Sequence, residues 1–251
     1  MSVSRRSFLT GLAACPLCAS IARAESAHPH WTYEGHGGPK EWGELAKEFQ
    51  VCALGTQQSP INLEAAIPAA QTALTLSWTA QPFKVVNNGH TIQADALSAA
   101  NTADLSGKVY ELKQFHFHAP SEHALGGERT AMEAHFVHAR PEGGLAVVGV
   151  FMKAGKANDA FAAVMAAAPK SEGAAAAQPV IDIARLLPER RSLYRYEGSL
   201  TTPPCAEVVD WNVFAAPIEV GQADIDAFRA IFPMNARPLQ AVNRRFLLQL
   251  N

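Results

Sequence analysis

The chain has 251 residues, of which 48% are hydrophobic and 18% charged, so it has ample material for a buried core and is not intrinsically disordered. Lys and Arg together number 21 and Asp and Glu 23, and the formal net charge of −2 argues against a nucleic-acid-binding protein. Nine His beside only four Cys exclude a disulfide-dense scaffold and direct attention to metal ligands.

Residues 1–24 have the organisation of an export signal. Arg5 and Arg6 precede a mostly apolar stretch from Phe8 to Ile21, and Ala22-Arg23-Ala24 provides a small-x-small cleavage signal. The paired arginines resemble a twin-arginine signal, which predicts a periplasmic or secreted protein cleaved after residue 24. The apolar stretch is short and interrupted by polar residues, so a membrane span is disfavoured.

A second interpretation of the leader stays open. Leu12-Ala13-Ala14-Cys15 resembles a lipoprotein box, which would tether the protein to a membrane through Cys15. Cleavage after residue 24 removes Cys15 and Cys18 and leaves Cys52 and Cys205 in an oxidising compartment, which favours one disulfide, with two buried thiols as the alternative.

The remainder of the chain, residues 25–251, is predicted to form one domain, because no linker, repeat or second long apolar run interrupts it. Residues 25–60 are rich in Gly, Pro, His and aromatic residues and predict an irregular N-terminal wrap. From about residue 72 to 152, short runs alternate with Gly, Asn and Asp turns, and Asn88-Gly89 is a turn signal. The strands expected here are 83–86, 91–94, 109–112 and 145–151.

The second half adds helices and further strands. Residues 157–168 are Ala-rich with apolar residues at helical spacing, and Pro169 ends that predicted helix. Strands are expected at 192–196 and 205–214, and a helix at 224–231.

Two histidines in the segment Gln114-Phe115-His116-Phe117-His118 share one face if the segment is a strand. Side chains of a strand alternate between faces, so His116 and His118 project to one side with Gln114, while both Phe side chains face the core. Two imidazoles at this spacing can share a metal ion.

A second strand, residues 132–138, is expected to pair antiparallel with the first after a turn around Gly126-Gly127. Its Glu133 and His135 share a face with Val137, so His135 can supply a third nitrogen. Three neutral histidines leave one position of a Zn²⁺ ion open, as catalytic zinc sites require. Gln114 and Glu133, each two residues from a ligand, are placed to hold the outer ring nitrogens.

The other histidines are interpreted differently. His138 points to the opposite face of its strand and is expected to be a core residue, and His123 is expected to be structural. The spacing of His116, His118 and Glu122 resembles the first metal motif of cupins. No Pro-x-Gly occurs near His135, and Ala139 replaces the Asn of the second cupin motif, so the cupin interpretation is disfavoured.

The segment Glu197-Gly198-Ser199-Leu200-Thr201-Thr202-Pro203-Pro204-Cys205 resembles the signature loop of α-class carbonic anhydrases. Five further blocks resemble that family and occur in the same order as in the family, and the resemblance extends over about residues 31–245. These five are Trp31-Thr32-Tyr33, QSPIN at 58–62, NNGH at 87–90, QFHFHAPSEH at 114–123 and MEAHFVH at 132–138.

The resemblance implies a mainly β (α+β) single domain, with a large, twisted, mostly antiparallel sheet and short peripheral helices. It implies one Zn²⁺ per chain on His116, His118 and His135, and reversible hydration of CO2 to bicarbonate. A zinc-bound water is acidified to a pKa near 7 in carbonic anhydrase. The implied catalytic pair is Thr201, whose hydroxyl orients the nucleophile, and Glu122, which accepts the hydrogen bond of that hydroxyl.

Further roles are implied by the same resemblance. His90 matches the proton shuttle, and Tyr33 and Asn88 match residues that order the water chain between the shuttle and the metal. Cys52 and Cys205 match a bridged pair of secreted bacterial members, and Pro60 and Pro204 match cis positions. The implied substrate-binding residues are Val137, Val147, Leu200, Thr201, Thr202, Val209 and Trp211.

Partners and alternatives complete the expectations. The expected partner is a small molecule, CO2 or bicarbonate, with no nucleic acid and no membrane span. A homodimer is compatible with the resemblance, since secreted bacterial relatives are often dimers. A binding protein of the same fold that has lost catalysis is a competing hypothesis, but such relatives usually lack a zinc histidine. A weak esterase activity is expected from the same nucleophile.

Overall fold

The structure is a computed structural model that describes residues 29–70, 74–174 and 176–251. The predicted leader, residues 1–24, lies outside the described residues. Among the helices that the structure describes, each is too short or too polar to cross a lipid bilayer.

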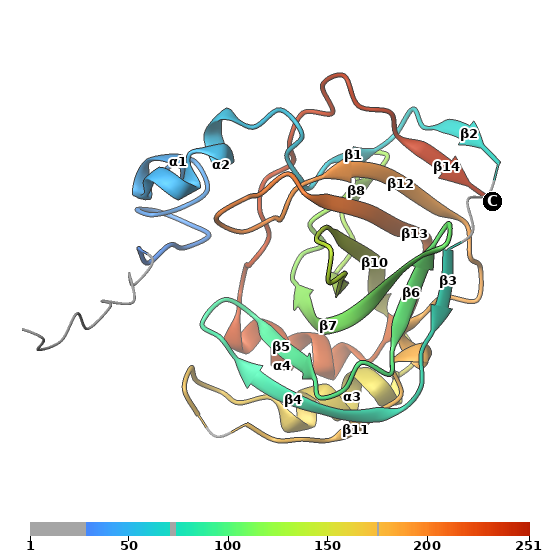
Figure 1. Cartoon of the computed structure of the whole chain (residues 1–251). Coiled ribbons are helices and arrows are strands. Elements are labelled where there is room, and N and C mark those ends of the chain that lie inside the picture. Colours follow the sequence, from blue (N-terminus) through green and yellow to red (C-terminus); the bar gives the residue numbers. More distant parts are fainter. Residues whose placement is uncertain (1–28, 71–73, 175) are drawn as a thin grey trace, which may run out of the picture.

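One twisted sheet organises the described part of the chain, which contributes twelve strands to it (Figure 1). Strands β3 (Leu74–Ser77) and β6 (Thr102–Leu105) pair with each other, and β6 also pairs with β7. The other ten strands, in the order in which they lie side by side, are β11 (Val180–Ile181), β4 (Gln81–Asn87), β5 (Ile92–Ala96), β7 (Lys108–His118), β9 (Met132–Ala139), β10 (Leu145–Ala154), β13 (Val209–Val220), β12 (Leu193–Gly198), β14 (Leu248–Leu250) and β2 (Ile67–Ala69).

Most neighbouring strands run antiparallel, as predicted. The exceptions in the large sheet are β10 with β13 and β14 with β2, which are parallel. A separate two-stranded parallel pair joins β1 (Asn62–Leu63) to β8 (Ala124–Leu125). The mainly β architecture predicted from the sequence, with one large, mostly antiparallel central sheet, is therefore confirmed.

The two faces of the sheet bury different kinds of side chain. The alternation along β7 sends Phe115 and Phe117 into the larger apolar cluster, where both are fully buried. Helices α3 (Asp159–Ala167) and α4 (Gln222–Ile231) pack on this face and lie next to each other (Figure 1). The opposite face carries the histidines and a second, smaller apolar cluster.

The predicted helices are present with small shifts at their ends. Helix α3 begins where the Asn158 side chain accepts hydrogen bonds from the N–H groups of Ala160 and Phe161, and it ends before Pro169. The N-terminal region contains short helices with irregular connections, to one side of the sheet in Figure 1. These helices are α1 (Trp42–Leu45), η1 (Lys47–Phe49) and α2 (Val51–Leu54), and a further short helix, η2 (Ile183–Leu186), lies beside α3.

The strand predicted at 205–214 begins later than expected. Cys205 has φ +56° and donates its N–H to the Thr202 carbonyl, so this segment turns instead of joining the ladder. Residues 199–208 form a loop, called the Thr201 loop below, and β13 begins at Val209. The strand continues to Val220, and its register with β10 shifts around Pro217, a residue that lacks the N–H donor of a regular ladder.

Candidate metal centre

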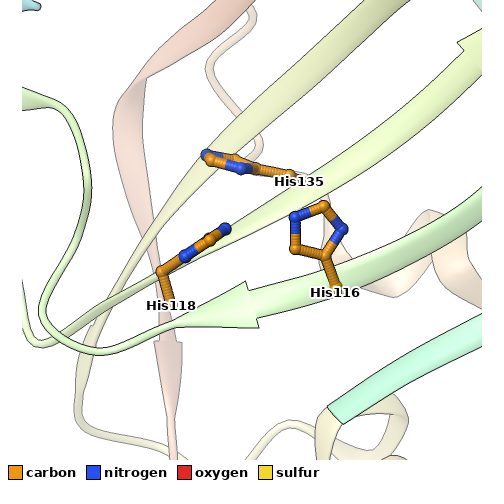
Figure 2. Close-up of side chains that lie close together, drawn as sticks. All are labelled: His116, His118 and His135. Atoms are coloured by element: carbon orange, nitrogen blue, oxygen red, sulfur yellow. The ribbon is translucent and has the colours of Figure 1, made fainter. Parts of the chain in front are cut away.

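Three histidines from two neighbouring strands converge on one point. In the antiparallel ladder of β7 and β9, His116 is directly opposite His135, and His118 lies one pleat further along the same face. Figure 2 shows the three rings turned toward one another. One nitrogen of each ring lies within 4.8 Å of the others, a spacing that suits a shared metal ion. The structure therefore brings together the three residues predicted as ligands.

The outer ring nitrogens are held by protein oxygens. His116 Nδ1 is 2.8 Å from Gln114 Oε1, and His118 Nδ1 donates to the Asn235 carbonyl over 2.7 Å. His135 Nε2 lies 3.0 Å from Glu133 Oε1. These contacts leave His116 Nε2, His118 Nε2 and His135 Nδ1 to face the centre.

The donor set fits a metal ion such as Zn²⁺. His118 Nε2 is buried and has no hydrogen-bond partner among the described residues. A buried imidazole nitrogen left without a partner is costly unless it binds something. Three imidazole nitrogens whose outer nitrogens are fixed in this way are the usual protein contribution to a catalytic zinc site.

The electrostatics favour the neutral form of His116 and His118. Burial lowers the pKa of His116 well below its ordinary value, and the neighbouring His118 and His135 lower it further. Burial also lowers the pKa of His118, against the opposing effect of Glu122. Burial would raise the pKa of Glu133, but His123 and His135 hold it well below the ordinary value, so this carboxylate is ionised.

A second group of close polar residues, His123, Glu133 and His135, belongs to the support of the first. His123 Nδ1 donates to Glu133 Oε1 over 2.8 Å, and its backbone N–H donates to Oε2 over 2.9 Å. Both carboxylate oxygens are thus engaged by protein. His123 is structural, as predicted, and its ring lies between Glu133 and the hydroxyl of Tyr196.

Room for Glu133 comes from a glycine on the next strand. Gly149 of β10 pairs with His135 across the ladder. A Cβ at this position would lie 3.0 Å from Glu133 Oε1 and 3.1 Å from a methyl group of Val213. The close approach of the carboxylate to His135 therefore depends on the absence of a side chain at residue 149.

Glu122 presents one free oxygen to the centre. Its Oε1 accepts the backbone N–H of Arg237 over 2.8 Å. Its Oε2 is buried without a hydrogen-bond partner among the described residues, 3.5 Å from His118 Nε2 and 3.8 Å from His135 Nδ1. Among the residues that the structure describes, no hydrogen bond joins Glu122 to Thr201, which is buried in the Thr201 loop. The predicted relay between these two residues stays a prediction.

The apolar residues predicted to bind substrate lie together beside the histidines. Val137, Val147 and Trp211 are cross-strand neighbours on β9, β10 and β13, and the Trp211 ring centroid is 4.8 Å from that of His135. Val209 and Leu200 belong to the same apolar cluster. Thr202, also predicted for substrate, is half-buried in the Thr201 loop, where its carbonyl accepts the Cys205 N–H.

The predicted shuttle residue occupies a tight turn between β4 and β5. The Asn88 side chain accepts the N–H groups of His90 and Thr91, which fixes the turn. The His90 ring is half-buried and stacks on Trp31, with centroids 3.7 Å apart and planes 6° from parallel. The Tyr33 ring lies 6.5 Å from that of His90. Burial, and then the charge of His30, lower the pKa of His90 below its ordinary value.

The two cysteines of the described region form the expected bridge. Cys52 and Cys205 are joined by a disulfide with their Cα atoms 5.0 Å apart, which ties α2 to the Thr201 loop. The peptide bonds before Pro60 and Pro204 are cis, as the family resemblance implied, and the bond before Pro120 is also cis.

Sequence reasoning missed the segment 235–237. The Asn235 carbonyl holds His118, and the Arg237 amide holds Glu122. A backbone carbonyl or amide can come from any residue type, so no sequence motif marks these contacts. The burial of Arg237, 1% exposed, marks the segment only once the structure is known, because a fully buried arginine is rare unless it is hydrogen-bonded.

A three-histidine centre on adjoining strands, with an oxygen beside each outer nitrogen, is the kind of site that can hold a single transition-metal ion. Residues 37–249 match the family model described as eukaryotic-type carbonic anhydrase. The chain is 38% identical over 242 residues to a carbonic anhydrase of Neisseria gonorrhoeae, with 96% of each chain covered. The chain therefore belongs to the α-carbonic anhydrase family, enzymes that interconvert CO2 and bicarbonate.

Solved structures agree with this membership. The α-carbonic anhydrase of Thermovibrio ammonificans in complex with the inhibitor sulfanilamide is 40% identical, with a TM-score of 0.82, covering 89% of this chain and 99% of that one. The Photobacterium profundum α-carbonic anhydrase is 41% identical, with a TM-score of 0.82, covering 88% of this chain and all of that one.

Proposed function

We propose that this protein binds one Zn²⁺ per chain through His116, His118 and His135 and catalyses the reversible hydration of CO2 to bicarbonate and a proton. One observation carries the proposal: three imidazole nitrogens converge while each outer nitrogen contacts a protein oxygen. When bound there, zinc supplies a Lewis acid that lowers the pKa of a coordinated water to near neutrality.

Gln114, Glu133 and the Asn235 carbonyl keep the three rings in their ligating orientation. Gln114 and the Asn235 carbonyl each fix a tautomer by accepting the proton of the outer nitrogen, which leaves the inner lone pair free, and Glu133 Oε1 lies 3.0 Å from the outer nitrogen of His135. The ionised Glu133 carboxylate also makes His135 a stronger ligand, because it stabilises positive charge on the ring.

Glu122 and Thr201 orient the attacking oxygen. The free Oε2 of Glu122 accepts the Thr201 hydroxyl proton, so the Thr201 oxygen is left to accept a hydrogen bond from the nucleophile. This order of donors points the nucleophile's lone pair at the carbon of CO2. The backbone N–H of Thr201 meets an oxygen of the substrate.

The apolar side chains beside the histidines bind CO2, which is a small molecule without a charged group. Val137, Val147, Leu200, Val209 and Trp211 exclude water from the approach to the metal and provide dispersion contacts. Thr202 contributes a polar group at the edge of this wall.

His90 carries the product proton to solvent. An imidazole has an ordinary pKa near 6.5 and can carry a proton near neutral pH, and the burial that lowers the pKa of His90 favours release of that proton to solvent. Asn88 fixes the turn that holds the His90 backbone, and Tyr33 orders water between His90 and the metal. The same nucleophile gives a weak esterase activity.

The protein acts in the periplasm or outside the cell, carried there by the twin-arginine-type leader and cleaved after Ala24. The disulfide between Cys52 and Cys205 suits an oxidising compartment. The mass of the mature N-terminus distinguishes this route from lipid attachment at Cys15. A homodimer is compatible with the proposal, and sedimentation of the mature protein tests it.

Metal analysis combined with stopped-flow CO2 hydration on the mature protein tests the proposed function. We expect one zinc per chain and rapid hydration that is lost with a chelator and restored by Zn²⁺. Stoichiometric zinc without hydration would instead support a binding protein, and iron with oxygen uptake would support a cupin-type oxygenase. Either result would overturn the proposal.

A further inference from the structure

We propose that Ser59 is a positioning residue of the metal centre, joining His135, Glu122 and the Thr201 loop through three sets of buried polar contacts. The inference rests on the proposed function, which assigns metal binding and catalysis to those three elements. Ser59 is fully buried in the segment that leads into β1. Its own hydrogen bonds go to Ser199, Tyr196 and Arg237, so it acts through other residues.

The first set leads to the metal ligand. Ser59 Oγ and the Tyr196 hydroxyl share a hydrogen bond of 3.0 Å, and that hydroxyl is 2.6 Å from His123 Nε2. His123 Nδ1 donates to Glu133, whose Oε1 lies 3.0 Å from His135 Nε2. All five side chains are at most 3% exposed, so water cannot readily replace a lost partner.

The second set fixes the beginning of the Thr201 loop. The Ser199 N–H donates to Ser59 Oγ over 3.1 Å, and the Ser59 N–H donates to Ser199 Oγ over 2.9 Å. Ser199 Oγ in turn donates to the Leu200 carbonyl over 2.7 Å. This reciprocal pair holds the backbone two residues before Thr201.

The third set reaches Glu122 through Arg237. The Ser59 carbonyl accepts from Arg237 Nη1 over 2.8 Å, and the backbone N–H of the same arginine donates to Glu122 Oε1 over 2.8 Å. The guanidinium also donates to the Cys52 carbonyl over 3.0 Å. Arg237 therefore contacts both residues, because its guanidinium donates to Ser59 and its backbone N–H donates to Glu122.

Gly198, which precedes Ser199, provides the space that the Ser59 hydroxyl occupies. A Cβ on Gly198 would overlap Ser59 Oγ and would lie 2.8 Å from the Tyr196 ring. Gly198 is thus required for the serine hydroxyl to reach both Tyr196 and Ser199.

Ser59→Ala separates these sets. It removes the partner of the Tyr196 hydroxyl and of the Ser199 amide, but it keeps the backbone bonds to Ser199 Oγ and Arg237. We therefore expect the metal ligand and the Thr201 loop to loosen while Glu122 stays in place. Tyr196→Phe loosens the metal ligand alone, because the Ser59–Ser199 pair remains.

The experiment uses zinc-loaded full-length protein and measures zinc release into a chelator together with kcat and KM for CO2 hydration. Direct outer partners of metal ligands are worth about 10–100-fold in affinity or activity, so we expect the lower end of that range for Ser59→Ala, about tenfold faster zinc release and about tenfold lower kcat. Tyr196→Phe should accelerate zinc release similarly with a smaller loss of kcat. The double variant should release zinc no faster than Ser59→Ala, since both changes break one chain.

Asn101→Ala is the matched control for stability. Asn101 is equally buried, and its side chain accepts the Thr79 N–H, so the variant loses buried hydrogen bonds without a link to the metal centre. Zinc release and kcat of Ser59→Ala within twofold of wild type, or effects equal to those of Asn101→Ala, would overturn the role of Ser59. If Ser59→Ala does not fold, Tyr196→Phe decides, and unchanged zinc release there overturns it. A wild-type protein without zinc or CO2 hydration would overturn the proposed function instead.

Discussion

Along β7, successive side chains enter two regions of different chemistry. Phe115 and Phe117 pack among other aromatic rings, and His116 and His118 face the candidate metal centre on the other side. On the aromatic side, apolar packing is sufficient to stabilise the fold, and a side chain can be replaced by an apolar one of similar volume at a modest cost in stability. On the histidine side, several buried polar groups depend on one particular partner, such as His116 Nδ1 on Gln114 and His118 Nδ1 on the Asn235 carbonyl, so a conservative change can leave a buried group unsatisfied. The four predictions below test this contrast.

The largest effect is expected from His135→Ala, which removes one ligand nitrogen from the metal face. We expect zinc in the purified protein to fall far below one per chain and kcat/KM to drop by more than about 1000-fold, beyond the cost of losing an outer partner. Metal analysis and stopped-flow hydration measure both.

His138→Ala is the matched control on the same strand. His138 is buried on the opposite face and stacks near Trp78, so its removal should lower stability but leave zinc at one per folded chain. Loss of zinc in both variants alike would contradict the division between the faces.

Phe115→Ala tests the aromatic face. This ring is fully buried between Phe83 and Phe136, so we expect the free energy of unfolding to fall by about 3–5 kcal/mol. Denaturant unfolding of the zinc-loaded protein measures the loss, and zinc per folded chain should not change. Phe246→Ala, at a ring that is 73% exposed, should stay within about 0.5 kcal/mol of wild type.

His138 also makes the aromatic face sensitive to pH. Burial lowers its pKa to about 4 in the folded protein, against about 6.5 when unfolded. The unfolded state therefore binds the proton first, and stability that is present above pH 6.5 is lost as pH falls toward 4. Between these pH values, the free energy of unfolding of metal-free wild type should fall by about 3 kcal/mol more than that of metal-free His138→Gln. Parallel stability curves for the two proteins would contradict this assignment.

The smallest effect is expected at the rim of the metal face. His90→Ala should lower turnover in weak buffer by about tenfold or more, because the excess proton then lacks a carrier. Added imidazole should restore turnover, which a purely structural defect would not allow. Stopped-flow hydration at several buffer concentrations measures both, and unchanged turnover removes the shuttle role.

The period of two along the strands made one part of the site predictable. It correctly placed His116 and His118 apart from Phe115 and Phe117, and it matched Gln114 to its ligand. Antiparallel pairing alone did not fix the register that sets His116 opposite His135, because register also depends on the turn and on the shift between Leu112 and Gln114.

Other parts depend on long-range backbone contacts, which sequence periodicity does not encode. The Asn235 carbonyl contacts His118, which is 117 positions away in the chain. Every residue type has a backbone carbonyl, so the amino-acid sequence does not indicate this contact. Residues 205–208 at the end of the Thr201 loop were predicted as strand because they lead directly into the β-branched and aromatic segment of β13. The positive φ of Cys205 that ends the ladder depends on its tertiary setting.

Gly149 sets a condition for anyone who wishes to transplant this centre into another scaffold. Copying the two strands that carry the rings would not suffice, because the third strand must leave a gap opposite His135 for the Glu133 carboxylate. An alanine there would push the carboxylate away from the ring it supports. A design that transfers this site must therefore specify a glycine on the third strand as well as the ligands themselves.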